Sequence, residues 1–126
     1  MGFAERIVPR PRWLDLGSLD EGQRLGYHAA CALAANHLAV LDAAAVEVLA
    51  GQGHDRKKVD AAMAALMRSA LDNLLALGFP AGVTGPAARG DRATVRAHLD
   101  ALDADTAALY RELSERLAYL LAARDA

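Results

Sequence analysis

Apolar residues recur along most of this chain at steps of three and four, which is the spacing of an amphipathic α-helix. The clearest stripe lies between residues 55 and 78, and its members are Val59, Met63, Leu66, Ala70, Leu74 and Leu77. Alternation of apolar and polar positions, which is typical of β-strands, is not sustained beyond the first dozen residues. Alanine and leucine, both strong helix formers, dominate instead. The pattern predicts an all-α fold.

Capping and stop residues predict where the first helix begins and ends. Prolines at positions 9 and 11 disfavour helix in the residues before them, so residues 1–17 are expected to form an extended lead-in. The segment from Ser18 to Glu21 matches a capping box, in which the serine oxygen accepts from an early amide. The helical domain is therefore predicted over residues 18–126, and its first helix ends near Ala50, just before Gly51.

Three further helices are predicted from aspartates that can serve as N-caps. Asp55 is placed to cap a second helix that ends at residue 77, and Asp91 to cap a third that ends at residue 102. Asp103 or Asp105 caps a fourth. Together with the long first helix, they predict a four-helix domain with one long central helix.

The first helix is apolar on nearly every side. The residues that cover its circumference are Leu25, Ala29, Leu33, Leu38, Val40, Leu41, Val46 and Leu49. A helix that is apolar all round is expected to be buried all round, and three shorter helices cannot easily enclose it. A second copy of the chain would supply the missing surface, so an intertwined helical homodimer is expected.

Composition narrows the classes of partner and compartment. The chain has 126 residues, 54% of them hydrophobic, which suits one compact domain. A formal charge of −2 is too small to gather nucleic acid or an anionic membrane surface, so neither is an expected partner. Cys31 is the only cysteine, so no intrachain disulfide is expected. The sequence pattern predicts neither a signal peptide nor a membrane span. A reducing, cytoplasmic location is expected.

Sequence motifs for cofactors and metals are not found. The chain contains no G-x-G-x-x-G, no G-x-x-x-x-G-K-[ST], no H-E-x-x-H and no C-x-x-C. We therefore expect the chain by itself to bind no nucleotide cofactor and no transition metal.

Two polar rows lie on the predicted helices. His28 and Asn36 are eight residues apart with small Ala32 between them, and they suit proton transfer and the holding of a substrate oxygen. The alternative is that the two satisfy each other, or a partner's backbone, inside the bundle. Ser69 and Asn73 form a second row, which either faces the first across a cleft or lies on the helix surface.

The glycine-rich loop from Thr84 to Asp91 is the least ordinary segment. Arg89 offers a bidentate fork for a carboxylate or phosphate, and Asp91 stands at a helix start, where free amides also favour anions. A small carboxylate or 2-oxo acid is the expected ligand, bound by Arg89 and polarised from the His28 side. The alternative is a structural turn in which Asp91 caps the helix and Arg89 pairs with it.

Four segments resemble one known family. They are Tyr27-His28-Ala29-Ala30 leading to Asn36, Arg68 to Asn73, Thr84 to Asp91, and Thr94 to Leu99. Their order and spacing resemble the family called domain of unknown function 2520 over roughly residues 24–121. The resemblance implies a helical domain like the C-terminal domain of 6-phosphogluconate dehydrogenase, which follows a Rossmann domain in NAD(P)-dependent oxidoreductases.

The resemblance also implies a role and a departure from the usual pattern. Such helical halves make the dimer and form one wall of the substrate cleft, so His28, Asn36, Ser69, Asn73, Thr84, Arg89 and Asp91 are implied to line that cleft. The wider superfamily often uses a lysine and an asparagine four apart, whereas His28 and Asn36 are eight apart. The chain carries no Rossmann half, so NAD or NADP is expected only if a Rossmann domain joins it, in cis or in trans. The alternative is a self-sufficient small helical enzyme or ligand-binding protein that uses the same cleft.

Overall fold

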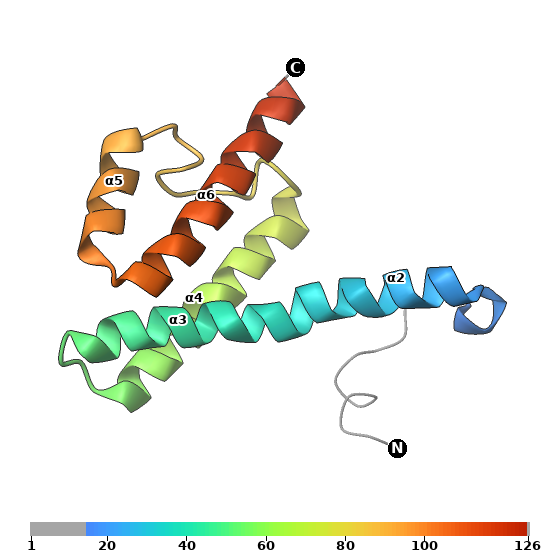
Figure 1. Ribbon diagram of the computed structural model, residues 1–126, viewed down its shortest axis with the longest axis horizontal. Coiled ribbons are helices and arrows are strands. Elements are labelled where there is room, and N and C mark those ends of the chain that lie inside the picture. Colours follow the sequence, from blue (N-terminus) through green and yellow to red (C-terminus); the bar gives the residue numbers. More distant parts are fainter. Residues whose placement is uncertain (1–14, 126) are drawn as a thin grey trace. The chain divides into compact units, whose positions relative to one another are not determined.

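The computed structural model describes residues 15–125, and every regular element in that range is helical (Figure 1). The predicted all-α fold with four helices, one of them long, is confirmed. Most of the predicted lead-in lies outside the described residues. The chain divides into two compact units, residues 1–41 and 42–126, and each is described by itself.

The N-terminal unit begins with a short 3-10 turn, η1 (Leu16–Ser18), followed by helix α2 (Glu21–Cys31). Asp20 is the N-cap of α2: its carboxylate accepts from the Gln23 amide at 2.8 Å, and the Gln23 side chain accepts from the Asp20 amide at 2.9 Å. The prediction that Ser18 caps this helix was therefore wrong by two residues. The Ser18 hydroxyl instead donates to the Asp15 carbonyl and closes the 3-10 turn.

A π-helical turn, η2 (Ala32–Asn36), interrupts the first helix between α2 and α3 (His37–Gly51). The His37 amide donates to the Ala32 carbonyl five residues back, which is the hydrogen bond that defines this turn. The sequence analysis predicted an unbroken helix and missed the turn. Helix α3 runs across the division between the two units.

The C-terminal unit contains the end of α3, then α4 (Arg56–Leu77), α5 (Arg92–Ala101) and α6 (Ala104–Asp125). The predicted caps Asp55 and Asp91 are confirmed, and of the two alternatives for the last helix Asp103 is the cap, since each of these side chains accepts from the amide three residues ahead. The turn between α3 and α4 is crossed by an ion pair, with Arg56 Nη1 2.7 Å from Glu47 Oε1.

Helices α5 and α6 pack side by side and run in opposite directions (Figure 1). His98 Nδ1 and the Tyr110 hydroxyl lie 2.8 Å apart, and their rings meet edge to face. At the far end of α6, Arg124 donates to the Phe79 carbonyl at 3.3 Å and lies 5.2 Å from the centre of the Phe79 ring. These contacts attach α6 to α5 and to the loop that follows α4.

The loop between α4 and α5 folds back on the end of α4 through Gly82, which is buried. A Cβ atom at Gly82 would lie only 2.6 Å from the Asn73 carbonyl oxygen and 3.0 Å from the Leu74 Cα. Only a residue without a side chain permits this approach of the loop to the helix backbone.

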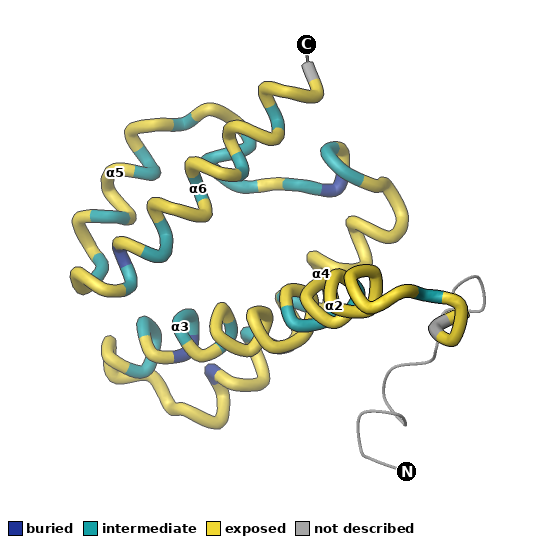
Figure 2. Tube along the Cα trace, turned by 45° about the vertical axis from the view of Figure 1, so that its right-hand side comes forward, coloured by how far each residue is buried: buried dark blue, intermediate teal, exposed yellow. Residues whose placement is uncertain are grey.

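Little of the apolar surface is covered within the chain (Figure 2). Among the described residues the buried core consists of Val46, Val59 and Ala107, whereas thirteen large apolar side chains are exposed. The stripe predicted to be buried on α4 is covered only in part: Val59 is buried and Met63 half-buried, but Leu66 is 61% and Leu77 62% exposed. Residues 15–125 thus leave much of the predicted apolar faces uncovered.

The helix Glu21–Gly51 has a further property. It is the one described helix that is long and apolar enough to cross a membrane by length and composition, with a mean hydropathy of 1.6 in its most apolar window. Core helices of soluble proteins meet the same criterion, although here only 6% of that window is buried within the chain. The expectation that the chain spans no membrane stays a prediction.

Candidate functional site

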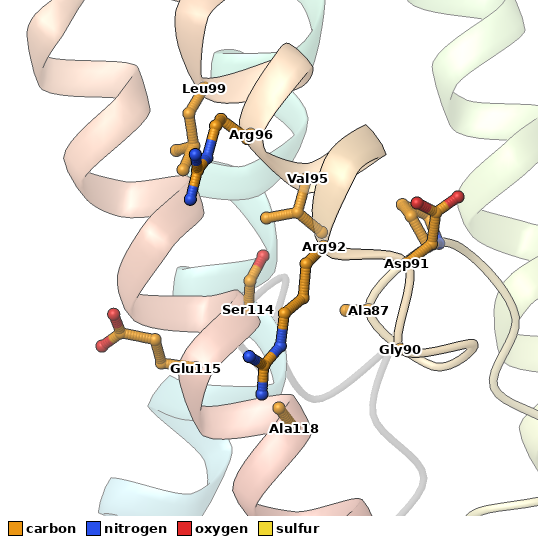
Figure 3. A pocket seen from close by; sticks show the side chains of 11 residues that line it. Ala87, Gly90, Asp91, Arg92, Val95, Arg96, Leu99, Ser114, Glu115 and Ala118 are labelled. Atoms are coloured by element: carbon orange, nitrogen blue, oxygen red, sulfur yellow. The ribbon is translucent and has the colours of Figure 1, made fainter.

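A pocket of about 460 Å³ opens between the loop that precedes α5, α5 itself and α6 (Figure 3). It lies wholly within the C-terminal unit. The residues around it are Pro86, Ala87, Gly90, Asp91, Arg92, Val95, Arg96, Leu99, Ser114, Glu115 and Ala118. The volume lies in the range of about 300–1,000 Å³ that is typical of small-molecule sites.

The two long cations of this pocket come from α5. Arg92 and Arg96 are one turn apart on that helix, and Figure 3 shows the Arg92 side chain extending along α6 toward Ala118. Val95 and Leu99 supply apolar surface beside them. The pocket thus combines an apolar lining with guanidinium groups that can donate two parallel hydrogen bonds to an oxyanion.

Asp91 is the predicted site residue that borders this pocket, and its carboxylate is engaged in capping. One oxygen accepts from the Thr94 amide at 3.1 Å and the other from the Thr94 hydroxyl at 2.7 Å. These hydrogen bonds, hydroxyl first and amide second, lower the pKa of Asp91, and the nearby charge of Arg89 lowers it further. Asp91 is therefore an ionised helix cap at neutral pH.

Arg89 and Thr84 are exposed and do not border the α5–α6 pocket. The Arg89 amide donates to the Gly85 carbonyl at 3.2 Å, and Gly85 has a φ of 105°, which favours glycine. Within residues 15–125 the Arg89 guanidinium forms no ion pair with Asp91 or any other carboxylate. The structural-turn alternative had two parts. Asp91 does cap α5, but Arg89 does not pair with Asp91.

Ser69 and Asn73 lie on α4, away from the α5–α6 pocket. Ser69 borders a shallow groove of about 430 Å³ on one face of this helix, together with Ala61, Ala64, Ala65, Arg68 and Asp72. Asn73 is exposed, and its backbone carbonyl lies against Gly82. Ser69 and Asp91 therefore border different pockets of the same unit.

His28 and Asn36 belong to the N-terminal unit, and both are exposed. In a regular α-helix, residues eight positions apart are rotated by about 80° around the axis. Because a π turn contains more residues per turn, the η2 segment (Ala32–Asn36) reduces that rotation and brings the two positions closer to one face. Single π turns inside α-helices are frequent at functional sites. The Tyr27 ring lies beside His28, with 5.8 Å between ring centres.

The sequence analysis missed Arg92, Arg96 and Ser114 as pocket residues. The two arginines carry a weak sequence signal, since they are four residues apart directly after the Asp91 cap. Ser114 carries none, because only the packing of α6 against α5 places it at the pocket. Among the described residues, no three histidine, cysteine or acidic side chains group as a metal site.

One comparison with known proteins gives a match. The model of the family described as Domain of unknown function (DUF2520) matches residues 14–117, which is most of the chain. Neither a curated protein nor a solved structure matches.

Proposed function

We propose that this chain, which belongs to the family Domain of unknown function (DUF2520), is the helical dimerisation and substrate-wall domain of an NAD(P)-dependent oxidoreductase. The oxidoreductase assignment rests on the resemblance of its motifs to helical halves that follow a Rossmann domain. The chain's part in that enzyme is to associate with a second copy and to present polar residues to the substrate.

The observation that carries the dimerisation role is the uncovered apolar surface. The first helix exposes Leu25 and Leu33 at 65% each and Val40 at 53%, and the buried core of the described chain is limited to three small or medium side chains. Exposed apolar surface on this scale marks an association surface, because covering it releases about 25 cal/mol per Å². A second copy of the same helix covers it symmetrically.

The residues of the substrate wall are polar and accessible. His28 and Asn36 are exposed near one face of the first helix, and the exposed Arg89 forms no ion pair within residues 15–125. In the N-terminal unit, the proposed role of His28 is to move a proton and that of Asn36 is to orient a substrate oxygen; in the C-terminal unit, the proposed role of Arg89 is to hold a small carboxylate or 2-oxo acid. Ser69, Asn73 and Thr84 contribute further hydrogen bonds, and Asp91 holds the start of α5.

The described residues do not fit a dinucleotide. A nicotinamide cofactor is held by a glycine-rich turn between a strand and a helix, and the part of the chain from 15 to 125 contains no strand. The cofactor would be held by a Rossmann domain, in cis or as a separate subunit.

Light scattering and cofactor titration on the full chain test this function together. We expect a dimer that persists at micromolar concentration, and no binding of NADPH or NADH tighter than about millimolar. A 13.3 kDa monomer at these concentrations would refute the dimerisation role. Tight binding of NADPH by the chain alone would instead favour a self-sufficient enzyme.

The α5–α6 pocket supports a second candidate function. Because all its lining residues come from the C-terminal unit, the chain could act as a ligand-binding protein without any other domain. Tight binding of a small molecule there by a chain that remains monomeric would favour this candidate over the first.

A further inference from the structure

We propose that the α5–α6 pocket binds a small amphipathic oxyanion, an apolar body carrying one carboxylate or phosphate, with Arg92 holding the anionic end and Arg96 adding positive charge to the pocket. Apart from Asp91, which borders the pocket as the cap of α5, this site shares no residue with the substrate wall, and it does not depend on the proposed oxidoreductase role. It lies in the C-terminal unit alone.

The charge distribution of the pocket supports an anion. Within residues 15–125, neither the Arg92 nor the Arg96 guanidinium has a hydrogen-bond or ion-pair partner. Two carboxylates also border the pocket, but both oxygens of Asp91 accept from Thr94, and the Glu115 side chain points away from Arg92 (Figure 3). The two arginines therefore remain available to a ligand.

The position of the arginines adds to this preference. Arg92 is the first residue of α5, so its end of the pocket lies at the positive end of a ten-residue helix. A guanidinium fork at a helix N-terminus suits the planar, bidentate geometry of a carboxylate and that of a phosphate equally.

The apolar lining determines the rest of the ligand. Pro86, Ala87, Val95, Leu99 and Ala118 provide mainly aliphatic surface. Inorganic phosphate would leave this apolar surface in contact with water, whereas an anion whose apolar body has the size of an aromatic ring would cover it. We therefore expect the apolar body and the charge to contribute together.

Four probes separate these contributions. Phenylacetate and phenyl phosphate present the same ring with a carboxylate or a phosphate, phenylacetamide presents the ring without charge, and inorganic phosphate presents charge without the ring. In titrations of the full chain followed by amide NMR shifts, we expect phenylacetate, phenyl phosphate or both to bind at least tenfold more tightly than phenylacetamide and inorganic phosphate. The shifts should concentrate in residues 92–99 and 114–118 and should be small at Arg89, which lies outside the pocket. Which ring anion binds more tightly identifies the anionic group.

Variants test the assignment of residues. Arg92→Gln removes the charge that holds the anion and should weaken binding of the ring anion at least tenfold, and Arg96→Gln should weaken it less. Arg116→Gln, a matched loss of charge on α6 outside the pocket, should leave it unchanged. Ala118→Phe fills the pocket without altering charge and should abolish binding while the helical circular dichroism is retained.

The proposal is overturned by any of three results. If phenylacetamide binds as tightly as phenylacetate, the charge of the ligand is irrelevant. If inorganic phosphate binds as tightly as phenylacetate, the apolar lining is irrelevant. Undiminished binding by both arginine variants would place the site elsewhere. None of these results bears on dimerisation or on the residues of the substrate wall.

Discussion

Replacing Leu33 by alanine should weaken the proposed dimer strongly while sparing the folded chain. Leu33 lies in the π turn and is 65% exposed, so about two thirds of its side chain is still uncovered. Burying a whole leucine contributes about 1.5–3 kcal/mol, and burying the uncovered part therefore contributes about 1–2 kcal/mol.

Symmetry doubles this contribution, because each protomer presents one Leu33 to the interface. Losing about 2–4 kcal/mol raises the dissociation constant by about 30- to 700-fold, since each 1.4 kcal/mol is a factor of ten. Alanine keeps the Cβ atom, so the lower part of this range is expected. Alanine is also at least as good a helix former as leucine, so the helix itself is not weakened.

Sedimentation velocity over a dilution series measures the dissociation constant directly. Leu113→Ala is the matched control, because Leu113 is 43% exposed on α6, outside the first helix. We expect Leu113→Ala to sediment like the unmodified chain and Leu33→Ala to dissociate at much higher concentration. A dissociation constant of Leu33→Ala within threefold of the unmodified value would refute the argument that the uncovered apolar face of the first helix forms the interface.

Three further predictions concern residues of the C-terminal unit. Gly82→Ala should destabilise the chain by about 1–3 kcal/mol in thermal unfolding, because its Cβ would lie 2.6 Å from a backbone oxygen, whereas Gly26→Ala, which meets no atom within 4 Å, should be neutral or stabilising. Asp91 has a lowered pKa in the folded chain, so its contribution to stability is present above its unfolded pKa of about 3.9 and is lost as the pH falls through the lower folded value. Asp91→Asn should therefore flatten the acid limb of a stability–pH curve, and an unchanged limb would contradict this. Arg89→Ala should abolish stabilisation by a small carboxylate or 2-oxo acid at the substrate wall and leave the melting temperature of the free protein almost unchanged, whereas unfolding would show that Arg89 ties down its loop.

Features that depend on neighbouring residues could be predicted from the sequence. The caps at Asp55 and Asp91 were predicted correctly, and Asp103 as one of two alternatives, because each depends on a hydrogen bond to an amide three residues away. The same short-range logic failed at the first helix, where Ser18 and Asp20 are both good caps. The reciprocal bonds between Asp20 and Gln23 decide in favour of Asp20.

The candidate site was predictable only in part. Asp91 borders a pocket and Ser69 a separate groove, but the cations of the α5–α6 pocket, Arg92 and Arg96, were not singled out, and Arg89 lies outside it. The π turn, which reduces the rotation about the helix axis between His28 and Asn36, was not predicted either. An extra residue in a helical hydrogen-bond ladder has no fixed sequence signature.

The sequence by itself determined the all-helical class and most helix ends, since these follow from local propensity, capping and periodicity. Only the tertiary structure decided which apolar residues are covered and which side chains share a pocket. Val59 is buried while Leu66 on the same stripe is 61% exposed, and Ser114 meets Arg92 at one pocket across more than twenty residues of chain. Such pairings depend on how whole helices pack, and helix periodicity specifies a face of a helix but not the element that will cover it.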